Sequence, residues 1–189
     1  DIFRVNRPKP PGGLEAAASL GKGLDNLIIF NSLSKRSNAS GMRAGFIAGD
    51  EKLIQSYKLL VSNGASPVPI PIQKVAASLY ADEEHHTKAC IHYDKNFSIV
   101  EKYLKPFYKD FKLPDAGFFL WLKVRDDQQA AKILWNKFSL RVMPGSFMGV
   151  DVNGFNPGKD FLRISLVDNE DVIEEAMKRI QLFLQSEIS

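Results

Sequence analysis

The stretch Ser32–Phe46, SLSKRSNASGMRAGF, carries the most specific chemistry of this chain. It follows Asn26–Phe30, an apolar run with the length and the β-branched content of a strand. A lysine that reacts as an amine needs a fixed position, and Lys35 stands among hydroxyl and guanidinium donors suited to an anion. Two glycines let the backbone approach a ligand closely. The donors and glycines are Ser32, Ser34, Arg43, Gly41 and Gly45. The sequence therefore predicts an amine beside an anion site on a loop at a strand end.

A polar turn with solvated lysine and arginine side chains is the alternative, and it would be preferred for an isolated S-x-S-K motif. The observed pattern is longer: S-x-S-K, five residues, and then G-x-R-x-G. This pattern resembles the cofactor-lysine signature of the class I/II aminotransferases, which are fold-type I pyridoxal 5'-phosphate (PLP) enzymes. The continuation SLSKRSN looks most like the N-succinyldiaminopimelate aminotransferase branch.

The resemblance implies a role for each matching residue. Lys35 matches the catalytic lysine to which PLP is attached. Ser32 and Arg43 match the ligands of the cofactor phosphate, and Ser34 is a further candidate for cofactor binding. The transamination that the family performs implies an amino acid and a 2-oxo acid as substrates, such as N-succinyl-LL-2,6-diaminopimelate with 2-oxoglutarate.

Three later segments resemble the same family in order and spacing. Pro114–Trp121 resembles its glycine-aromatic strand, and Met143–Phe147 resembles its Pro-Gly-Ser loop. Phe161–Leu166 resembles the strand whose arginine binds the substrate α-carboxylate, which implies that role for Arg163. For an arginine considered alone, a surface ion pair at a strand edge would be the better interpretation.

Length and composition agree with a globular protein. The 189 residues are 44% hydrophobic, and 25 Lys and Arg nearly balance 22 Asp and Glu, giving a net charge of +3. This balance argues against a nucleic-acid or membrane surface and suits small anionic substrates. The single cysteine, Cys90, excludes an internal disulfide and fits a reducing compartment, so we expect the cytoplasm.

The resemblance covers only the C-terminal half of an aminotransferase. It implies an α/β fold class, the end of the PLP-binding sheet followed by an α+β small domain. The expected domains are a large-domain remnant at 1–66, connecting helices at 67–104 and a small domain at 105–189. Because the family's earlier cofactor contacts are not identifiable here, we expect this chain alone to be weakly active or inactive. The full enzyme is expected to be a homodimer.

Hydrophobic periodicity and turn residues predict the elements between these motifs. Asp50 is expected to cap a helix that Ser62–Pro67 interrupts. Further helices are expected from Ile72 to about Leu104, with a break near Ala81. The remaining predicted helices are 14–20, 127–138 and 169–184, and the predicted strands are 27–30, 44–48, 117–124, 140–143 and 161–166.

Other interpretations of the chain are weaker or stay open. Glu84, His85, His86 and His92 have no organised partners for a metal, so a solvated helix with scattered histidines is expected and no metal site is predicted. Gly145–Ser146 lacks the G-x-S-x-G pattern of a serine nucleophile. The open alternatives are an aspartate-type or other amino-acid aminotransferase, another PLP reaction such as β-elimination or decarboxylation, and a non-catalytic binding or dimerising domain.

Overall fold

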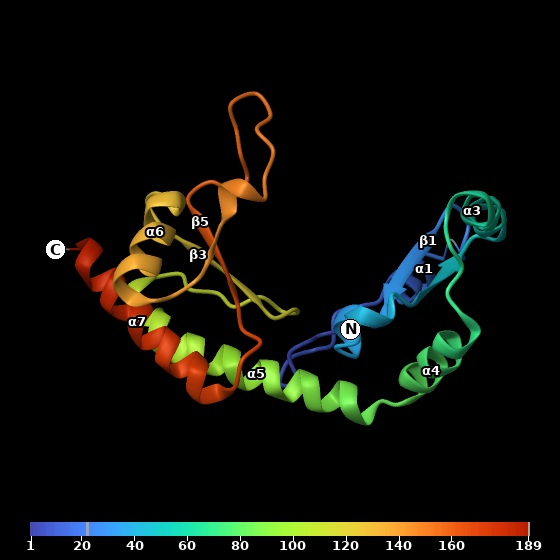
Figure 1. The fold of residues 1–189 in the computed structure, drawn as a ribbon, viewed down its shortest axis with the longest axis horizontal. Helices are drawn as coiled ribbons and strands as arrows, with labels where there is room; N and C mark the ends of the chain where they lie inside the picture. Colours follow the sequence, from blue (N-terminus) through green and yellow to red (C-terminus); the bar gives the residue numbers. More distant parts are fainter. Residues whose placement is uncertain (22, 189) are drawn as a thin grey trace. The chain divides into compact units, whose positions relative to one another are not determined.

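The computed structural model describes residues 1–21 and 23–188, and for residue 188 the backbone alone. The chain divides into two compact units, Asp1–Cys90 and Ile91–Ser189, which are described separately below (Figure 1). Each unit combines helices with antiparallel strands, in agreement with the predicted α/β class. The division into three domains stays a prediction.

The first unit is built around a two-stranded ribbon. Strand β1 (Ile28–Ser32) pairs antiparallel with β2 (Gly45–Gly49), and Ser32 lies opposite Gly45. A side chain at Gly45 would place its Cβ 2.2 Å from the Asn31 carbonyl oxygen, so this close approach requires glycine. The two predicted strands are therefore confirmed, and β1 is longer than expected.

Short helices occupy the segment between the two strands. Helix α2 (Leu33–Arg36) follows β1 directly, and the 3₁₀ helix η1 (Ser40–Met42) precedes β2. The prediction of a loop around Lys35 is therefore wrong, because the Ser32 side chain caps a helical turn there.

Three longer elements complete the first unit: α1 (Gly13–Ser19), α3 (Glu51–Gly64) and α4 (Ile70–Ala81). Asp50 caps α3 as predicted, accepting hydrogen bonds from the backbone N–H of Lys52 at 2.7 Å and of Leu53 at 3.3 Å. Helix α3 continues to Gly64, past the predicted interruption at Ser62. Helix α4 starts two residues earlier than expected, because Pro71 is tolerated in a first turn, where its missing N–H would have no partner.

The second unit is a three-stranded antiparallel sheet with order β3-β5-β4. Helix α5 (Glu84–Leu104) starts in the first unit and leads into it. The other elements are η2 (Lys105–Phe107), β3 (Phe119–Lys123), α6 (Asp127–Phe138), β4 (Met143–Pro144), η3 (Gly145–Phe147), β5 (Phe161–Ser165) and α7 (Glu170–Ile188). The predicted strand 140–143 is displaced, since pairing with β5 involves only Met143 and Pro144.

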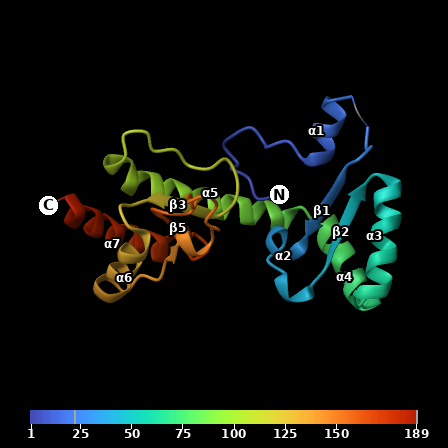
Figure 2. The same cartoon turned by 90° about the horizontal axis from the view of Figure 1, so that it is seen from above.

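The core of the second unit lies between one face of the sheet and helices α5, α6 and α7 (Figure 2). Alternate residues of the strands point into it, as the period of a strand requires. The opposite face carries Trp121 and Arg163, which are direct partners on β3 and β5. The buried residues of β3 and β5 are Leu120, Leu122, Leu162 and Ile164.

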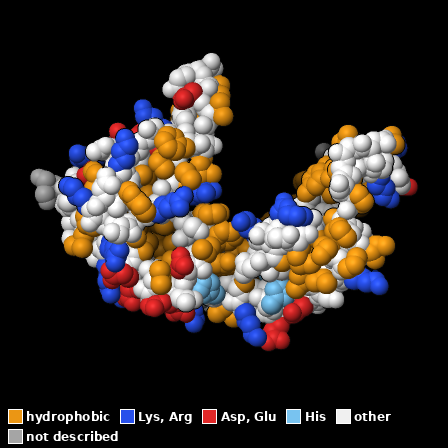
Figure 3. Space-filling view, viewed as in Figure 1, with side chains coloured by type: hydrophobic (Ala, Val, Ile, Leu, Met, Phe, Trp, Pro, Cys, Tyr) orange, Lys and Arg blue, Asp and Glu red, His pale blue; other side chains and the backbone are white. Residues whose placement is uncertain are grey.

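A long connection between η3 and β5 projects from the second unit (Figure 1). It exposes large apolar side chains, which Figure 3 shows in orange on the projecting loop. They are Met148, Val150, Val152 and Phe155. At its base the backbone is tightly packed, because a Cβ on Gly145 would lie 2.2 Å from the Gly158 carbonyl oxygen.

Candidate active site

Helix α2 holds the predicted cofactor lysine. Ser32 is its N-cap, and the Ser32 Oγ accepts a hydrogen bond of 3.1 Å from the Ser34 backbone N–H. The same hydroxyl donates to the Ser34 Oγ at 2.9 Å. Lys35 is exposed in the second half of this single turn. The two serine hydroxyls and the lysine amine are therefore presented on one short segment at the end of β1.

The orientation of α2 is set by the two residues that flank Ser34 and Lys35. Leu33 and Arg36 are three positions apart and so lie on the same helix face. Both are buried, with 0% and 6% of their surface exposed. Leu33 packs in a small apolar cluster with Ala44 and Ala76. Because this face is anchored inward, Lys35 is directed outward.

Arg43 reaches the same region through the ribbon. The Leu33 N–H donates to the Ala44 carbonyl at 3.2 Å, which places the residue next to Arg43 against the start of α2. The backbone of Arg43 adopts a left-handed conformation with φ of 50°. This conformation is uncommon for residues other than glycine and asparagine. Its Nη1 donates to the Ser40 carbonyl at 2.8 Å. The guanidinium carries five N–H donors in all, so it has further capacity for an anion.

Of the five predicted site residues, Ser32, Ser34 and Lys35 lie on or next to α2, and Arg43 precedes Ala44, whose carbonyl accepts from the first residue of α2. An amine that can form an imine, two hydroxyls and a guanidinium are the groups that a phosphorylated aldehyde requires. The chemistry of this donor set therefore fits PLP.

Arg163, the fifth predicted residue, lies on the central strand of the second unit. Its guanidinium carbon is 4.5 Å from the centroid of the Phe119 ring, a cation–π contact that steadies the side chain. Trp121 and Met143 flank it on the neighbouring strands. Arg163 is half-buried on the face away from the core, so its charge remains accessible to an anionic ligand.

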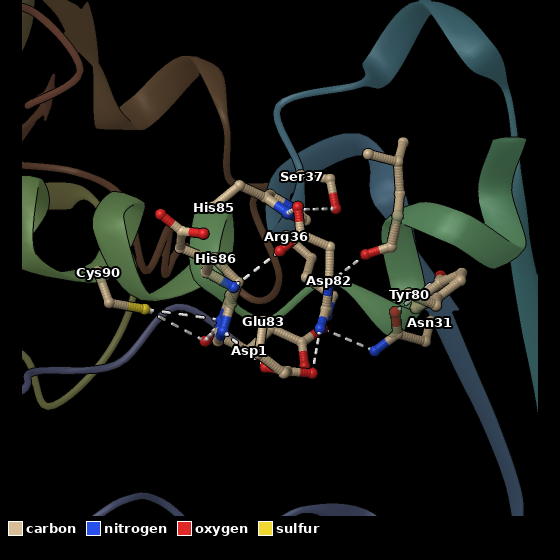
Figure 4. Close-up of polar contacts among 12 residues, drawn as sticks. Asp1, Asn31, Arg36, Ser37, Tyr80, Asp82, Glu83, His85, His86 and Cys90 are labelled. Carbon is tan, nitrogen blue, oxygen red and sulfur yellow. Dashed lines mark hydrogen bonds and ion pairs between the residues drawn. The ribbon is translucent and has the colours of Figure 1, made fainter.

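Sequence reasoning missed the polar network behind α2 (Figure 4). Arg36 donates to the Leu79 carbonyl at 3.0 Å and to the Glu83 carboxylate at 2.5 Å. The Tyr80 hydroxyl donates to the Asn31 Oδ1 at 3.0 Å. Burial raises the pKa of Tyr80, and the positive charge of Arg36 opposes that rise. The burial of Arg36 could have been suspected only from its spacing of three residues from Leu33.

Of the two histidines at the start of α5, His86 is buried and His85 is partly buried, which corrects the prediction of a solvated helix there. His86 is only 5% exposed and donates from Nε2 to the Asp1 carbonyl at 2.6 Å. His85 shares a hydrogen bond of 2.8 Å with the Ser37 hydroxyl. The sequence could not reveal these contacts because their partners lie far away along the chain. Among residues 1–21 and 23–188, no three or more His, Cys, Asp and Glu side chains are grouped to hold a metal ion.

A buried carboxylate organises the Pro-Gly-Ser loop of the second unit. Asp127 is 3% exposed and accepts from the backbone N–H of Ser146 at 2.8 Å and of Asp160 at 3.3 Å. Burial favours the neutral form of this carboxyl, but the hydrogen bonds from Ser146 and Asp160 outweigh it and lower the pKa of Asp127. The loop is therefore held by an ionised side chain.

The sequence profile described as "Aminotransferase class I and II" matches residues 9–180. The chain belongs to this family. The match includes α2 with Lys35 and the strand with Arg163. Class I and II aminotransferases use PLP, which is thus the cofactor that family membership assigns.

Individual relatives agree with the family assignment. The chain is 30% identical over 177 residues to LL-diaminopimelate aminotransferase 2 from Trichormus variabilis, covering 92% of this chain and 43% of the relative. It is 28% identical over 166 residues to an aspartate aminotransferase from Thermotoga maritima, covering 87% of this chain and 41% of that protein.

A crystal structure of an aminotransferase from Neisseria meningitidis Z2491 is similar to the chain, with a TM-score of 0.89 and 37% identity. The similarity covers 96% of this aminotransferase chain and 47% of that protein. The chain therefore spans about half the length of the relatives it matches. Within the described part of the chain, no helix has the length and apolar character needed to cross a membrane.

Proposed function

We propose that the protein containing this chain is a PLP-dependent transaminase that moves an amino group between an amino acid and a 2-oxo acid. The observation that carries the proposal is the presentation of Lys35 on a capped turn beside the Ser32 and Ser34 hydroxyls. Membership of the aminotransferase family supports the reaction class.

Each residue of the proposed site then has a defined role. The Ser32 hydroxyl and the Arg43 guanidinium bind the cofactor phosphate, and Ser34 assists Ser32. Lys35 Nζ would hold the cofactor covalently, and its amine would hold and move the proton at the substrate Cα. Arg163 binds the substrate α-carboxylate and orients the Cα–H bond. PLP, when bound, supplies the electron sink for that bond.

We further propose a diaminopimelate-type amino donor, with N-succinyl-LL-2,6-diaminopimelate and 2-oxoglutarate as the first pair to test. The Arg36-Ser37-Asn38 continuation after the lysine supports the N-succinyl form. The relatives named LL-diaminopimelate aminotransferase support the diaminopimelate skeleton without the succinyl group. We also propose that the full protein acts as a homodimer in the cytoplasm.

The test uses the full-length protein that contains residues 1–189. After addition of PLP and borohydride, peptide mass spectrometry should find the cofactor attached to Lys35. Lys35→Ala should bind PLP without covalent attachment and lose turnover. Full turnover of Lys35→Ala would overturn the role of the lysine.

A substrate panel then separates the reactions. Formation of glutamate from 2-oxoglutarate is expected with N-succinyl-diaminopimelate, and LL-diaminopimelate and aspartate are the comparison donors. Release of ammonia or CO₂ without glutamate would replace transamination by elimination or decarboxylation. No cofactor attachment at all would indicate a binding domain.

A further inference from the structure

We propose that Arg36 is a positioning residue for Lys35, acting through a two-pronged contact with the junction between α4 and α5. The proposal rests on the proposed function, because it assigns Lys35 the cofactor. The Arg36 side chain is buried and donates to Leu79 and Glu83, whereas Lys35 on the same turn is exposed.

Helix α2 is too short to be stable as an isolated helix. Four residues make a single turn, which is not stable in water by its own hydrogen bonds. Its orientation must therefore come from side chains that pack behind it. Leu33 supplies apolar contact within a cluster that also includes larger side chains such as Met42 and Ile72, but apolar packing is not directional and fixes the rotation of the helix less precisely than hydrogen bonds do.

Arg36 makes directional hydrogen bonds, which apolar packing does not provide, and these can fix the orientation of α2. Its Nη1 donates to the Leu79 carbonyl at 3.0 Å and its Nη2 to the Glu83 Oε1 at 2.5 Å. Figure 4 shows Arg36 lying against the segment that carries Glu83. A planar guanidinium with two acceptors in fixed directions has a defined position, which a lysine ammonium does not reproduce.

The same junction also holds the strand end before α2. Tyr80 donates to Asn31, the residue immediately before the Ser32 cap, and its ring lies 5.5 Å from the Arg36 guanidinium. Tyr80 also contacts Phe46 of β2 edge to face, with ring centroids 5.1 Å apart. The turn bearing Lys35 is thus fixed on both sides by consecutive residues near the end of α4.

The charge distribution favours positioning over direct action. The Arg36 side chain is 7% exposed, whereas its partner Glu83 is 70% exposed. The arginine charge is therefore compensated on the side away from the cofactor site. Loss of the guanidinium would leave the Leu79 carbonyl without this donor and let α2 rotate.

The experiment compares Arg36→Met, Arg36→Lys and Glu83→Gln in the full-length protein. The rate of covalent attachment of PLP to Lys35 is followed by visible absorbance and by borohydride trapping. Arg36→Met is expected to slow attachment and reduce kcat by roughly tenfold to a hundredfold, with little change in the KM for 2-oxoglutarate. Arg36→Lys should recover part of the loss, and Glu83→Gln should show a severalfold loss.

Arg179→Met is the matched control. Arg179 also donates to one backbone carbonyl, that of Phe138 at 3.2 Å, and to one carboxylate, that of Glu175 at 2.9 Å, but it lies in the second unit. This variant should attach PLP at the wild-type rate. Attachment at the wild-type rate in both Arg36→Lys and Glu83→Gln would overturn the proposal, even if Arg36→Met does not fold.

The outcomes separate this inference from the proposed function. If the wild-type protein attaches no PLP at Lys35, the proposed function fails. If the wild-type protein attaches PLP and the Arg36 variants do so equally well, only the positioning role fails. A thermal melt of each variant distinguishes slow attachment by a folded protein from loss of fold.

Discussion

The Asp127 carboxylate accepts a hydrogen bond of 2.8 Å from the backbone N–H of Ser146, and this contact joins the first turn of α6 to the Pro-Gly-Ser loop. Asp127→Ala should lower the free energy of unfolding by about 2 kcal/mol, since a charged hydrogen bond is lost from a buried site. Urea unfolding measures this change. Asp110→Ala, at an exposed position, is the control.

The same carboxylate predicts a pH dependence. The pKa of Asp127 is lowered in the folded state, so its contribution to stability is complete above the ordinary carboxyl pKa. The contribution is lost as the pH falls through that value toward the folded pKa. Asp127→Asn should flatten the acid limb of stability against pH, and an unchanged limb would contradict this assignment.

Leu33→Ala should destabilise the first unit and disturb the cofactor lysine together. Leu33 has no exposed surface and packs against Ala44 and Ala76. Removing its side chain should cost about 3 kcal/mol in unfolding free energy. Chemical denaturation measures the cost, and a loss below about 1 kcal/mol would show that the cluster does not hold α2.

Asn96 should be intolerant of a charge. Its side-chain amide is buried and donates at 2.9 Å to the carbonyls of both Leu166 and Asp168, which ties α5 to the end of β5. Asn96→Asp replaces a donor by an acceptor facing two carbonyl oxygens, whereas Asn96→Ala only removes the donor. Asn96→Asp should therefore have the lower melting temperature at neutral pH, and acidification should narrow the difference.

The pKa of His86 should depend on the positive charge of Arg36. Burial and, secondly, the Arg36 charge lower the pKa of His86, while the Glu83 carboxylate opposes them. The neutral ring therefore stabilises the fold above the unfolded pKa of about 6.5, and this stability is lost as the pH falls below that value. Arg36→Met should raise the His86 pKa in an NMR titration. A pKa that stays constant would show that the two charges do not interact.

Arg163→Ala should raise the KM for the amino acid by roughly tenfold to a hundredfold, because a charge-assisted contact with the α-carboxylate is lost. Steady-state kinetics on the full-length protein checks this. PLP attachment at Lys35 should be unaffected, which separates substrate binding from cofactor binding. A KM equal to that of the wild type would show that Arg163 does not bind the substrate α-carboxylate.

Local signals in the sequence predicted much of the fold. Alternation of apolar residues located β3 and β5, and Asp50 marked the start of α3 through its capping preference. These features depend on neighbours within a few residues. The boundaries were less accurate where pairing decided them, as at β4, whose extent depends on Leu162 and Arg163 across the sheet.

The candidate site likewise has features that local sequence predicts and features that depend on tertiary packing. The identities and spacing of Ser32, Lys35 and Arg43 suffice to predict an amine near an anion site, because the chemistry depends on residue type and order. That Lys35 lies on a helix and not on a loop follows from the Ser32 cap and from packing behind it.

By itself, the sequence determined the family and the chemical groups that this aminotransferase chain presents. Only the tertiary structure decided which of the two nearby arginines, Arg36 and Arg43, is buried. Arg36, next to the lysine, is buried against Leu79 and Glu83, whereas Arg43 is exposed. The difference arises because burial and hydrogen-bond partners depend on residues more than forty positions away, which no local pattern contains.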